Sequence, residues 1–203
     1  MDEKSSGKLT ITQIRQIETL KYLKAFEIDY LDKKGSLKKW ELVSRHGEDR
    51  LKDEINNGAL YSDGAMIFAT NREKTHVVLL KEFRVSAGHY VYMLPAGLSD
   101  SGESLEVTSK REFKEETGLD FEYVSHSKPR FVSVGIVNER IEIAYGFYSG
   151  NVSDAFQSDE EDAEVVFVDR DMAQSLLASE DVSVRSALLL EHFFNLNEFF
   201  DRS

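Results

Sequence analysis

The sequence predicts a mixed fold of helices and strands, α/β in the broad sense and α+β in the narrow one. Many short strands are expected with a few helices between them. Short apolar stretches rich in β-branched and aromatic residues recur along the chain, bounded by turn-forming residues. Near the middle of the chain, one such stretch runs into a glycine-bearing loop and then into a segment that suits a helix. The 203 residues, 41 % of them hydrophobic, suffice for one domain with additions.

The first predicted element is an amphipathic helix. Residues 11–23 are expected to form it, because Ile14, Ile17 and Leu20 recur at a spacing that places them near one helix face.

A β-hairpin is expected next. Residues 25–31 and 37–45 read as two strands around the turn Asp32-Lys33-Lys34-Gly35. We therefore predict two domains. Residues 1–50 would carry the helix and the hairpin as a dimerisation element, and residues 51–203 would form the main domain.

The main domain is expected to combine strands with three helices. Strands are predicted over residues 65–70, 76–83, 90–94, 121–124, 130–136, 140–148 and 163–168. Helices are predicted over residues 104–117, 172–177 and 183–200. The helix over 104–117 contains no Pro or Gly, and Gly118 is a natural residue to end it.

The helix over 104–117 carries a group of carboxylates. Glu112 and Glu116 lie one turn apart on one face, and Glu115 joins the same group. Carboxylates this close repel one another unless a cation lies among them, and oxygen ligands suit Mg²⁺ or Mn²⁺. Arg111 can pair with Glu115 and hold it in place. The alternative is an ordinary solvated acidic helix face.

The spacing of the surrounding residues favours the cation site. Nine positions match the pattern G-x5-E-x7-R-E-U-x-E-E-x-G-U, with U apolar: Gly97, Glu103, Arg111, Glu112, Phe113, Glu115, Glu116, Gly118 and Leu119. This pattern is the Nudix box, so the chain resembles the Nudix hydrolases. The resemblance implies an α/β/α sandwich with a mixed sheet, a loop–helix–loop metal site, and hydrolysis of a nucleoside diphosphate linked to a further group.

The resemblance also implies roles for the residues of the box. Glu112, Glu116 and the carbonyl of Ala96 would bind Mg²⁺ or Mn²⁺, and Glu115 would be a further ligand or a carboxylate that Arg111 holds. A water molecule activated by the metal would attack a diphosphate phosphorus.

Residues around the box resemble the ADP-ribose pyrophosphatase branch of the family. The similar segments are Glu82-Phe83-Arg84, Tyr90-Val91-Tyr92, Leu94-Pro95-Ala96-Gly97, Trp40 to Arg45, and Ser133-x-Gly135-x-x-x-Glu139. The resemblance implies that Trp40 stacks on adenine and that Arg45 and Arg84 bind phosphates, as an indole face and guanidinium groups can. It further places Gly97 and Glu139 near the substrate, and it implies a homodimer that exchanges N-terminal strands.

The expected reaction converts ADP-ribose to AMP and ribose 5-phosphate. Two departures from the branch bear on the substrate, because Val134 replaces a usual Pro and Met93 replaces a usual Glu. A different nucleotide sugar such as GDP-mannose is therefore an alternative. A non-catalytic Nudix domain that senses a ligand is a second alternative, less favoured because every carboxylate of the box is present.

The general base is expected on the polar loop of residues 151–162. Similar ADP-ribose enzymes place a Glu of the matching loop over the metals, and alignment on the following strand selects Glu161. Glu160 and Glu139 are the competing candidates, and a plain solvated acidic loop is the structural alternative.

Composition narrows the partners to small molecules. A net charge of −12 disfavours a nucleic-acid backbone, whose binders need a basic face. The longest apolar runs are too short to span a bilayer, so no membrane partner is expected. Because the sequence starts with polar residues, we expect no signal peptide. The absence of Cys fits a reducing compartment, so we expect a cytoplasmic protein.

Overall fold

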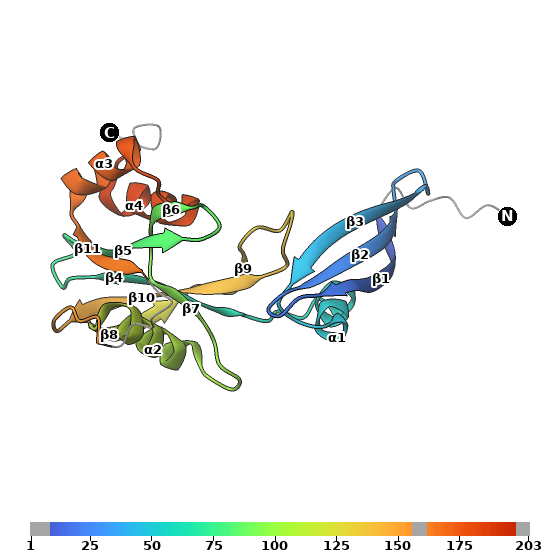
Figure 1. Ribbon diagram of the computed structural model, residues 1–203, viewed down its shortest axis with the longest axis horizontal. Coiled ribbons are helices and arrows are strands. Elements are labelled where there is room, and N and C mark those ends of the chain that lie inside the picture. The colour runs from blue at the N-terminus through green and yellow to red at the C-terminus, as the bar shows by residue number, and fades with distance from the viewer. Residues whose placement is uncertain (1–8, 156–161, 198–203) are drawn as a thin grey trace. The chain divides into compact units, whose positions relative to one another are not determined.

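The computed structural model describes residues 9–155 and 162–197 (Figure 1). The strands are β1 (Thr10–Thr19), β2 (Lys24–Leu31), β3 (Leu37–Ser44), β4 (Gly64–Thr70), β5 (Val77–Arg84), β6 (His89–Met93), β7 (Ala96–Leu98), β8 (Asp120–His126), β9 (Arg130–Phe131), β10 (Arg140–Ser149) and β11 (Ala163–Val168). The helices are α1 (Glu48–Lys52), the π-helical turn η1 (Asp53–Asn57), α2 (Leu105–Thr117), α3 (Arg170–Ser179) and α4 (Val184–Phe194).

The chain forms two compact units. Unit 1 contains the described residues up to Asp63 together with Pro129–Ile141, and unit 2 contains Gly64–Lys128 with the described residues from Glu142 onward. The predicted boundary near residue 50, as a division into functional domains, stays a prediction.

Unit 1 is built on the antiparallel sheet β1-β2-β3. The predicted hairpin of β2 and β3 is confirmed, and its turn is closed by Asp32, whose carboxylate accepts the N–H groups of Lys34 and Ser36. Helix α1 and the turn η1, which were not predicted, bury Leu51 against Phe26 of the sheet. This sheet therefore has a small apolar core of its own.

The predicted N-terminal helix is wrong, because residues 10–19 form strand β1. Its sequence, TITQIRQIET, is rich in β-branched residues, which favour a strand. Ile14 pairs with Ile28 of β2 and is buried, whereas Ile17 is exposed. Pairing with β2 and burial of one isoleucine therefore outweighed the helical spacing of the others.

Unit 2 surrounds a sheet of order β11-β5-β4-β10-β8, with β6 paired to β5 and β7 paired to β4. Strand β4 is buried along its whole length, and its side chains alternate between two helical layers. Ala65, Ile67 and Ala69 belong to the core cluster that includes Phe113 of α2. Phe68 instead contacts Phe193 of α4, with ring centroids 5.3 Å apart.

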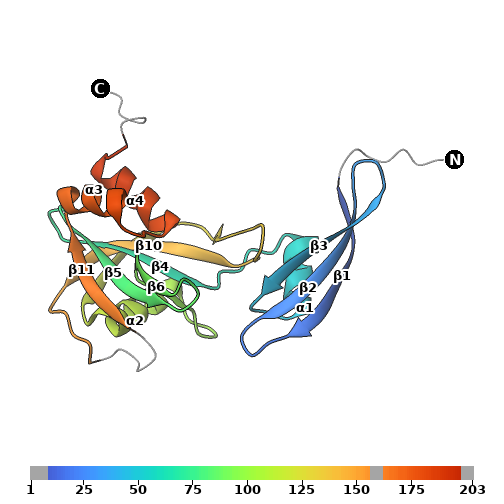
Figure 2. The ribbon, with the colours of Figure 1, turned by 45° about the horizontal axis from the view of Figure 1, so that its top comes forward.

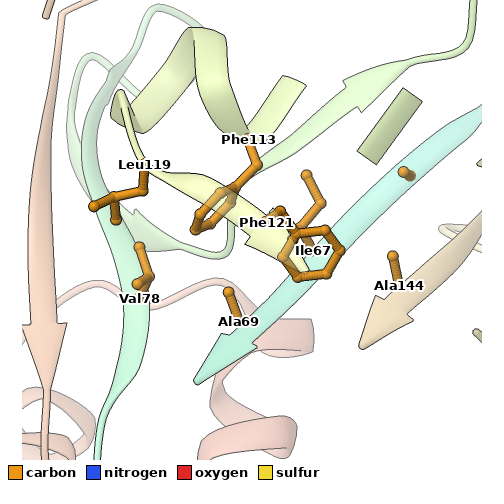
Figure 3. Close-up of a cluster of buried hydrophobic side chains, with 8 residues drawn as sticks. Ile67, Ala69, Val78, Phe113, Leu119, Phe121 and Ala144 are labelled. Carbon is orange, nitrogen blue, oxygen red and sulfur yellow. The ribbon is translucent and has the colours of Figure 1, made fainter. Parts of the chain in front are cut away.

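The two helical layers lie on opposite faces of this sheet. Figures 1 and 2 show α2 on one side and α3 with α4 on the other. On the α2 side, Figure 3 shows Phe113 and Phe121 beside Ile67, and the two phenyl rings lie 5.4 Å apart. Burial of these aromatic side chains fixes α2 on the sheet. The predicted α/β/α sandwich is therefore confirmed.

Two further predicted elements are shorter than expected. The strand predicted over 130–136 ends at Phe131, because the Ser133 carbonyl accepts the N–H groups of Ile136 and Val137 and forms a turn. Helix α4 ends at Phe194, since Asn195 takes the left-handed conformation with φ of 51°. No helix in the described part of the chain is long and apolar enough to cross a bilayer.

Candidate active site

Local sequence defines both ends of helix α2, which carries the predicted site. Ser104 is the N-cap, and its Oγ accepts the N–H of Val107 at 3.3 Å. Gly118 ends the helix with φ of 72°, and a Cβ at this position would lie 2.4 Å from the backbone N of Ser153. Local sequence therefore sets where α2 begins and where it ends.

Glu103 is the anchor of the loop before α2. Its carboxylate accepts Nε and Nη2 of Arg111 at 3.0 and 2.9 Å, the Asp100 N–H at 3.1 Å and the Thr108 hydroxyl at 3.0 Å. Arg111 is the largest cause that lowers the pKa of Glu103, to about 2. Glu103 in turn raises the pKa of Arg111 above its ordinary value. Both groups are therefore charged at any physiological pH.

Arg111 connects Glu103 to the predicted catalytic carboxylates. Its Nη1 donates to Glu112 Oε1 at 2.8 Å and to Glu115 Oε2 at 3.3 Å, and its Nη2 donates to the Leu98 carbonyl at 3.1 Å. The predicted pair of Arg111 with Glu115 is confirmed. The same guanidinium also neutralises Glu103 and Glu112, so it reduces the repulsion among these carboxylates.

Glu112 and Glu116 both reach the stretch Ala96–Gly97. Glu116 Oε2 accepts the Ala96 N–H at 3.0 Å. A Cβ on Gly97 would lie 1.9 Å from Cδ of Glu112, so only glycine lets this carboxylate approach the backbone. Two carboxylates that are one helical turn apart therefore converge on two consecutive residues of the chain.

This convergence fits a hard divalent cation. Mg²⁺ is commonly bound by one or two carboxylates and completes its coordination with water and substrate phosphates. Among the described residues, no three His, Asp or Glu side chains are gathered as a ready-made metal site. Mg²⁺ needs few protein ligands, and Glu112 and Glu116, with carbonyl oxygens of the adjacent backbone, would suffice for that number. The ligand roles of Ala96, Glu112, Glu115 and Glu116 stay predictions.

The predicted substrate residues of unit 1 lie on β3, directly after its end, and in the segment 129–141. Trp40 is 48 % exposed and lines an apolar cavity of about 400 Å³, together with Ile11, Phe131 and Val134. Arg45 donates from Nε to Glu139 Oε1 at 2.5 Å. The structure thus brings two of the predicted residues, Arg45 and Glu139, into one ion pair.

Two further predicted residues are Arg84 in unit 2 and Glu161 of the polar loop. Arg84 ends β5, and its Nη1 donates to Glu82 Oε1 at 2.5 Å. Glu161 lies outside the described residues. Asp162, which follows it, accepts the Tyr90 hydroxyl at 2.7 Å, so the end of the loop is fixed to β6.

Sequence reasoning assigned no role to Glu103 and did not detect Ser186. Glu103 matches the box, and its spacing of eight residues from Arg111 is the signal that could have suggested an ion pair. Ser186 of α4 is fully buried and accepts the Leu94 N–H at 2.9 Å. A single serine 92 residues away gives no sequence signal for this bond.

The sequence is similar to a known family model and to several characterised proteins. A family model described as NUDIX domain matches residues 60–189. The chain is 30 % identical to an ADP-sugar pyrophosphatase of Mus musculus over 142 residues, which are 67 % of this chain and 60 % of that protein. It is 28 % identical to a GDP-mannose pyrophosphatase of Shigella flexneri over 172 residues, which are 80 % of this chain and 87 % of that protein.

A solved structure has a fold similar to that of this chain. A crystal structure of an ADP compounds hydrolase superposes with a TM-score of 0.70 at 20 % sequence identity, covering 91 % of this chain and 92 % of that chain. Several curated relatives are longer proteins, of which the chain spans only about half to three fifths. The match over more than half of the sequence, together with the geometry of α2, establishes that the chain belongs to the Nudix family.

Proposed function

We propose that this protein hydrolyses the diphosphate linkage of a nucleoside diphosphate sugar in a reaction that depends on Mg²⁺ or Mn²⁺. ADP-ribose is the proposed substrate, and AMP and ribose 5-phosphate are the products. The convergence of Glu112 and Glu116 on Ala96–Gly97 is the observation that carries this proposal. The names of the mouse relative and of the structural neighbour favour an adenosine diphosphate compound.

The carboxylates of α2 would bind the cation together with the Ala96 carbonyl. A bound divalent cation lowers the pKa of a water molecule and neutralises charge on phosphoryl oxygens. Arg111 is the positioning residue in this scheme, because it contacts both Glu112 and Glu115 while Glu103 holds its other nitrogens. The carboxylates are therefore oriented before substrate arrives, which reduces the reorganisation that the reaction requires.

The hydrolysis needs an acceptor for the proton of the attacking water. As water forms the new bond to phosphorus, the bond from that phosphorus to an oxygen of the leaving group breaks. Glu161 is the proposed acceptor, since the carboxylates of α2 would be bound to cation. The Tyr90 hydroxyl donates to Asp162, the residue that follows Glu161 in the sequence.

Substrate recognition is proposed for Trp40, Arg45, Arg84, Gly97 and Glu139. Each arginine donates to a neighbouring glutamate, Arg45 to Glu139 and Arg84 to Glu82. Such pairs orient a guanidinium while leaving other N–H groups for phosphate oxygens. The half-exposed face of Trp40 suits stacking on a base.

The apolar cavity beside Trp40 supports a homodimer. Its rim includes exposed Ile11, Phe131 and Val134, and exposed apolar patches commonly mark contact surfaces between proteins. We propose a second copy of this chain as the partner.

GDP-mannose is the second candidate substrate. The alignment with the Shigella flexneri GDP-mannose pyrophosphatase extends over more of this chain than the alignment with the mouse protein does. A panel of ADP-ribose, ADP-glucose, GDP-mannose and ATP with Mg²⁺ separates the two candidates. We expect ADP-ribose to have the highest kcat/KM. A preference for GDP-mannose or ATP of about tenfold, or about 1.4 kcal/mol, would contradict the proposed substrate.

A further inference from the structure

The segment Leu94–Gly97 contacts both helical layers of unit 2. The Leu94 N–H donates to Oγ of Ser186 on α4 at 2.9 Å, and the Ala96 N–H donates to Glu116 of α2 at 3.0 Å. Helices α4 and α2 lie on opposite sides of the sheet (Figure 2). The backbone between β6 and β7 is therefore fixed from both sides within three residues.

Ser186 is held in place by the start of its own helix. It is fully buried, and its N–H donates to Oγ of the N-cap Ser183 at 3.3 Å, whose hydroxyl in turn donates to Ser186 Oγ at 2.8 Å. The backbone of Ser183 is attached to β6 as well, because its N–H donates to the Tyr92 carbonyl at 2.9 Å. The oxygen that meets Leu94 therefore has little freedom to move.

Pro95 transmits this constraint to Ala96. The proline ring fixes φ near −65°, and the residue has no N–H of its own. The Pro95 carbonyl accepts the Ile67 N–H of β4 at 2.8 Å. A shift of Leu94 can therefore be taken up before Ala96 only by rotation about ψ of Pro95, which the bond of the Pro95 carbonyl to β4 restricts.

We infer that Ser186 is a positioning residue for the cation site, which it sets through Leu94 and Pro95 rather than by contact with a ligand. Its Oγ, together with the pairing of Ala96 with Met66 of β4, sets where the Ala96 backbone lies relative to Glu116. This inference rests on the proposed function, because it assumes that Ala96, Glu112 and Glu116 bind the cation.

The test uses Ser186→Ala, which removes the acceptor and leaves the buried Leu94 N–H without its partner. Binding of Mn²⁺ is measured without substrate, from the electron paramagnetic resonance signal of the free ion. We expect the Kd for Mn²⁺ to rise about tenfold or more, as for other changes behind metal ligands. Amide exchange at Leu94 and Ala96 should become faster, while KM for ADP-ribose at saturating Mg²⁺ changes little.

Leu188→Gly is the matched control. It weakens the same helix at an exposed position, but it leaves Ser186 Oγ and the Ser183 hydroxyl that holds it in place. We expect it to lower Tm while the Kd for Mn²⁺ stays within about twofold of wild type. If Ser186→Ala does not fold, Ser186→Cys retains a weaker acceptor of similar size and should give an intermediate affinity.

Three outcomes would overturn the inference. The first is wild-type Mn²⁺ affinity in Ser186→Ala, or in Ser186→Cys if only that variant folds. The second is an equal loss of affinity in Leu188→Gly, which would assign the effect to helix stability. The third is a wild-type protein that neither binds Mn²⁺ nor cleaves any nucleotide sugar, which would overturn the proposed function as well.

Discussion

Among single residues, Arg111 explains how a carboxylate before α2 and two carboxylates on α2 can lie close together. Its guanidinium donates to Glu103, Glu112 and Glu115 and to the Leu98 carbonyl. A rigid fork with several donors suits this task better than the point charge of a lysine. Glu103 contacts Arg111 through both carboxylate oxygens, so the pair acts as a fixed support for the other two carboxylates.

The pKa of Glu103 predicts acid sensitivity. Its pKa falls from 4.5 to about 2 on folding, chiefly because of Arg111. A lowered pKa stabilises the folded state above pH 4.5, and this contribution is lost as pH falls from 4.5 towards 2. Glu103→Gln should therefore lower Tm at pH 7, and the difference from wild type should shrink at pH 3.

Glu106→Gln is the control for that experiment, because Glu106 pairs with Lys110 on the exposed surface of the same helix. It should change Tm little at either pH. An equal Tm difference between wild type and Glu103→Gln at pH 7 and pH 3 would contradict the proposed ion-pair support.

Glu161 carries a separate kinetic prediction. Glu161→Gln should lower kcat by about 100-fold or more, because a general base contributes on that scale. KM should stay within a few-fold, the pattern of an interaction made mainly in the transition state. Steady-state kinetics with ADP-ribose measures both values. If this variant is active and Glu139→Gln or Glu160→Gln is inactive instead, the base is misassigned.

Among the elements, α2 and β7 approach closely, and this approach positions the carboxylates of Glu112 and Glu116 beside the β7 backbone. Gly97→Ala should displace the Glu112 carboxylate, since the new Cβ would lie 1.9 Å from Cδ of that side chain. A flexible side chain can move, so Tm should change little while kcat/KM for ADP-ribose falls about tenfold or more. Gly47→Ala is the control, because its Cβ would meet nothing within 4 Å. Wild-type kinetics in Gly97→Ala would contradict this role for the glycine.

Elements with local signals at both ends could be predicted well from the sequence. Helix α2 begins after Ser104 and ends before Gly118, as its capping residues indicate. Strand β1 could not be predicted, because the spacing of its isoleucines also suits a helix and only pairing with β2 resolves the ambiguity. The end of α4 depended on Asn195 adopting positive φ, which an apolar pattern does not reveal.

The candidate site likewise has one part that the sequence predicts and another part that only the folded chain reveals. The carboxylates of the box are close in sequence on one helix, so their spacing predicts their grouping. The bond from Leu94 to Ser186 joins residues 92 positions apart, and only the folded sheet brings them together. The pair of Arg45 with Glu139 likewise depends on the return of the chain to unit 1 over residues 129–141.

At the scale of the whole molecule, the exposed apolar surface of unit 1 predicts a homodimer. Light scattering at micromolar protein should give twice the 23.2 kDa mass of the chain. Ile11→Lys should favour the monomer, because it places a charge beside the cavity that Trp40 lines. A fully active wild-type monomer at the same concentration would contradict the dimer.

The whole molecule is proposed to hydrolyse a diphosphate linkage with a cation that the carboxylates of α2 bind. The most direct measurement is the rate of AMP release from ADP-ribose, with and without Mg²⁺, for wild type and Glu116→Gln. We expect rapid release by wild type only with Mg²⁺, and a kcat at least about a hundredfold lower in the folded variant. Equal rates in the two proteins, or release by wild type that persists after chelation of divalent cations, would contradict it.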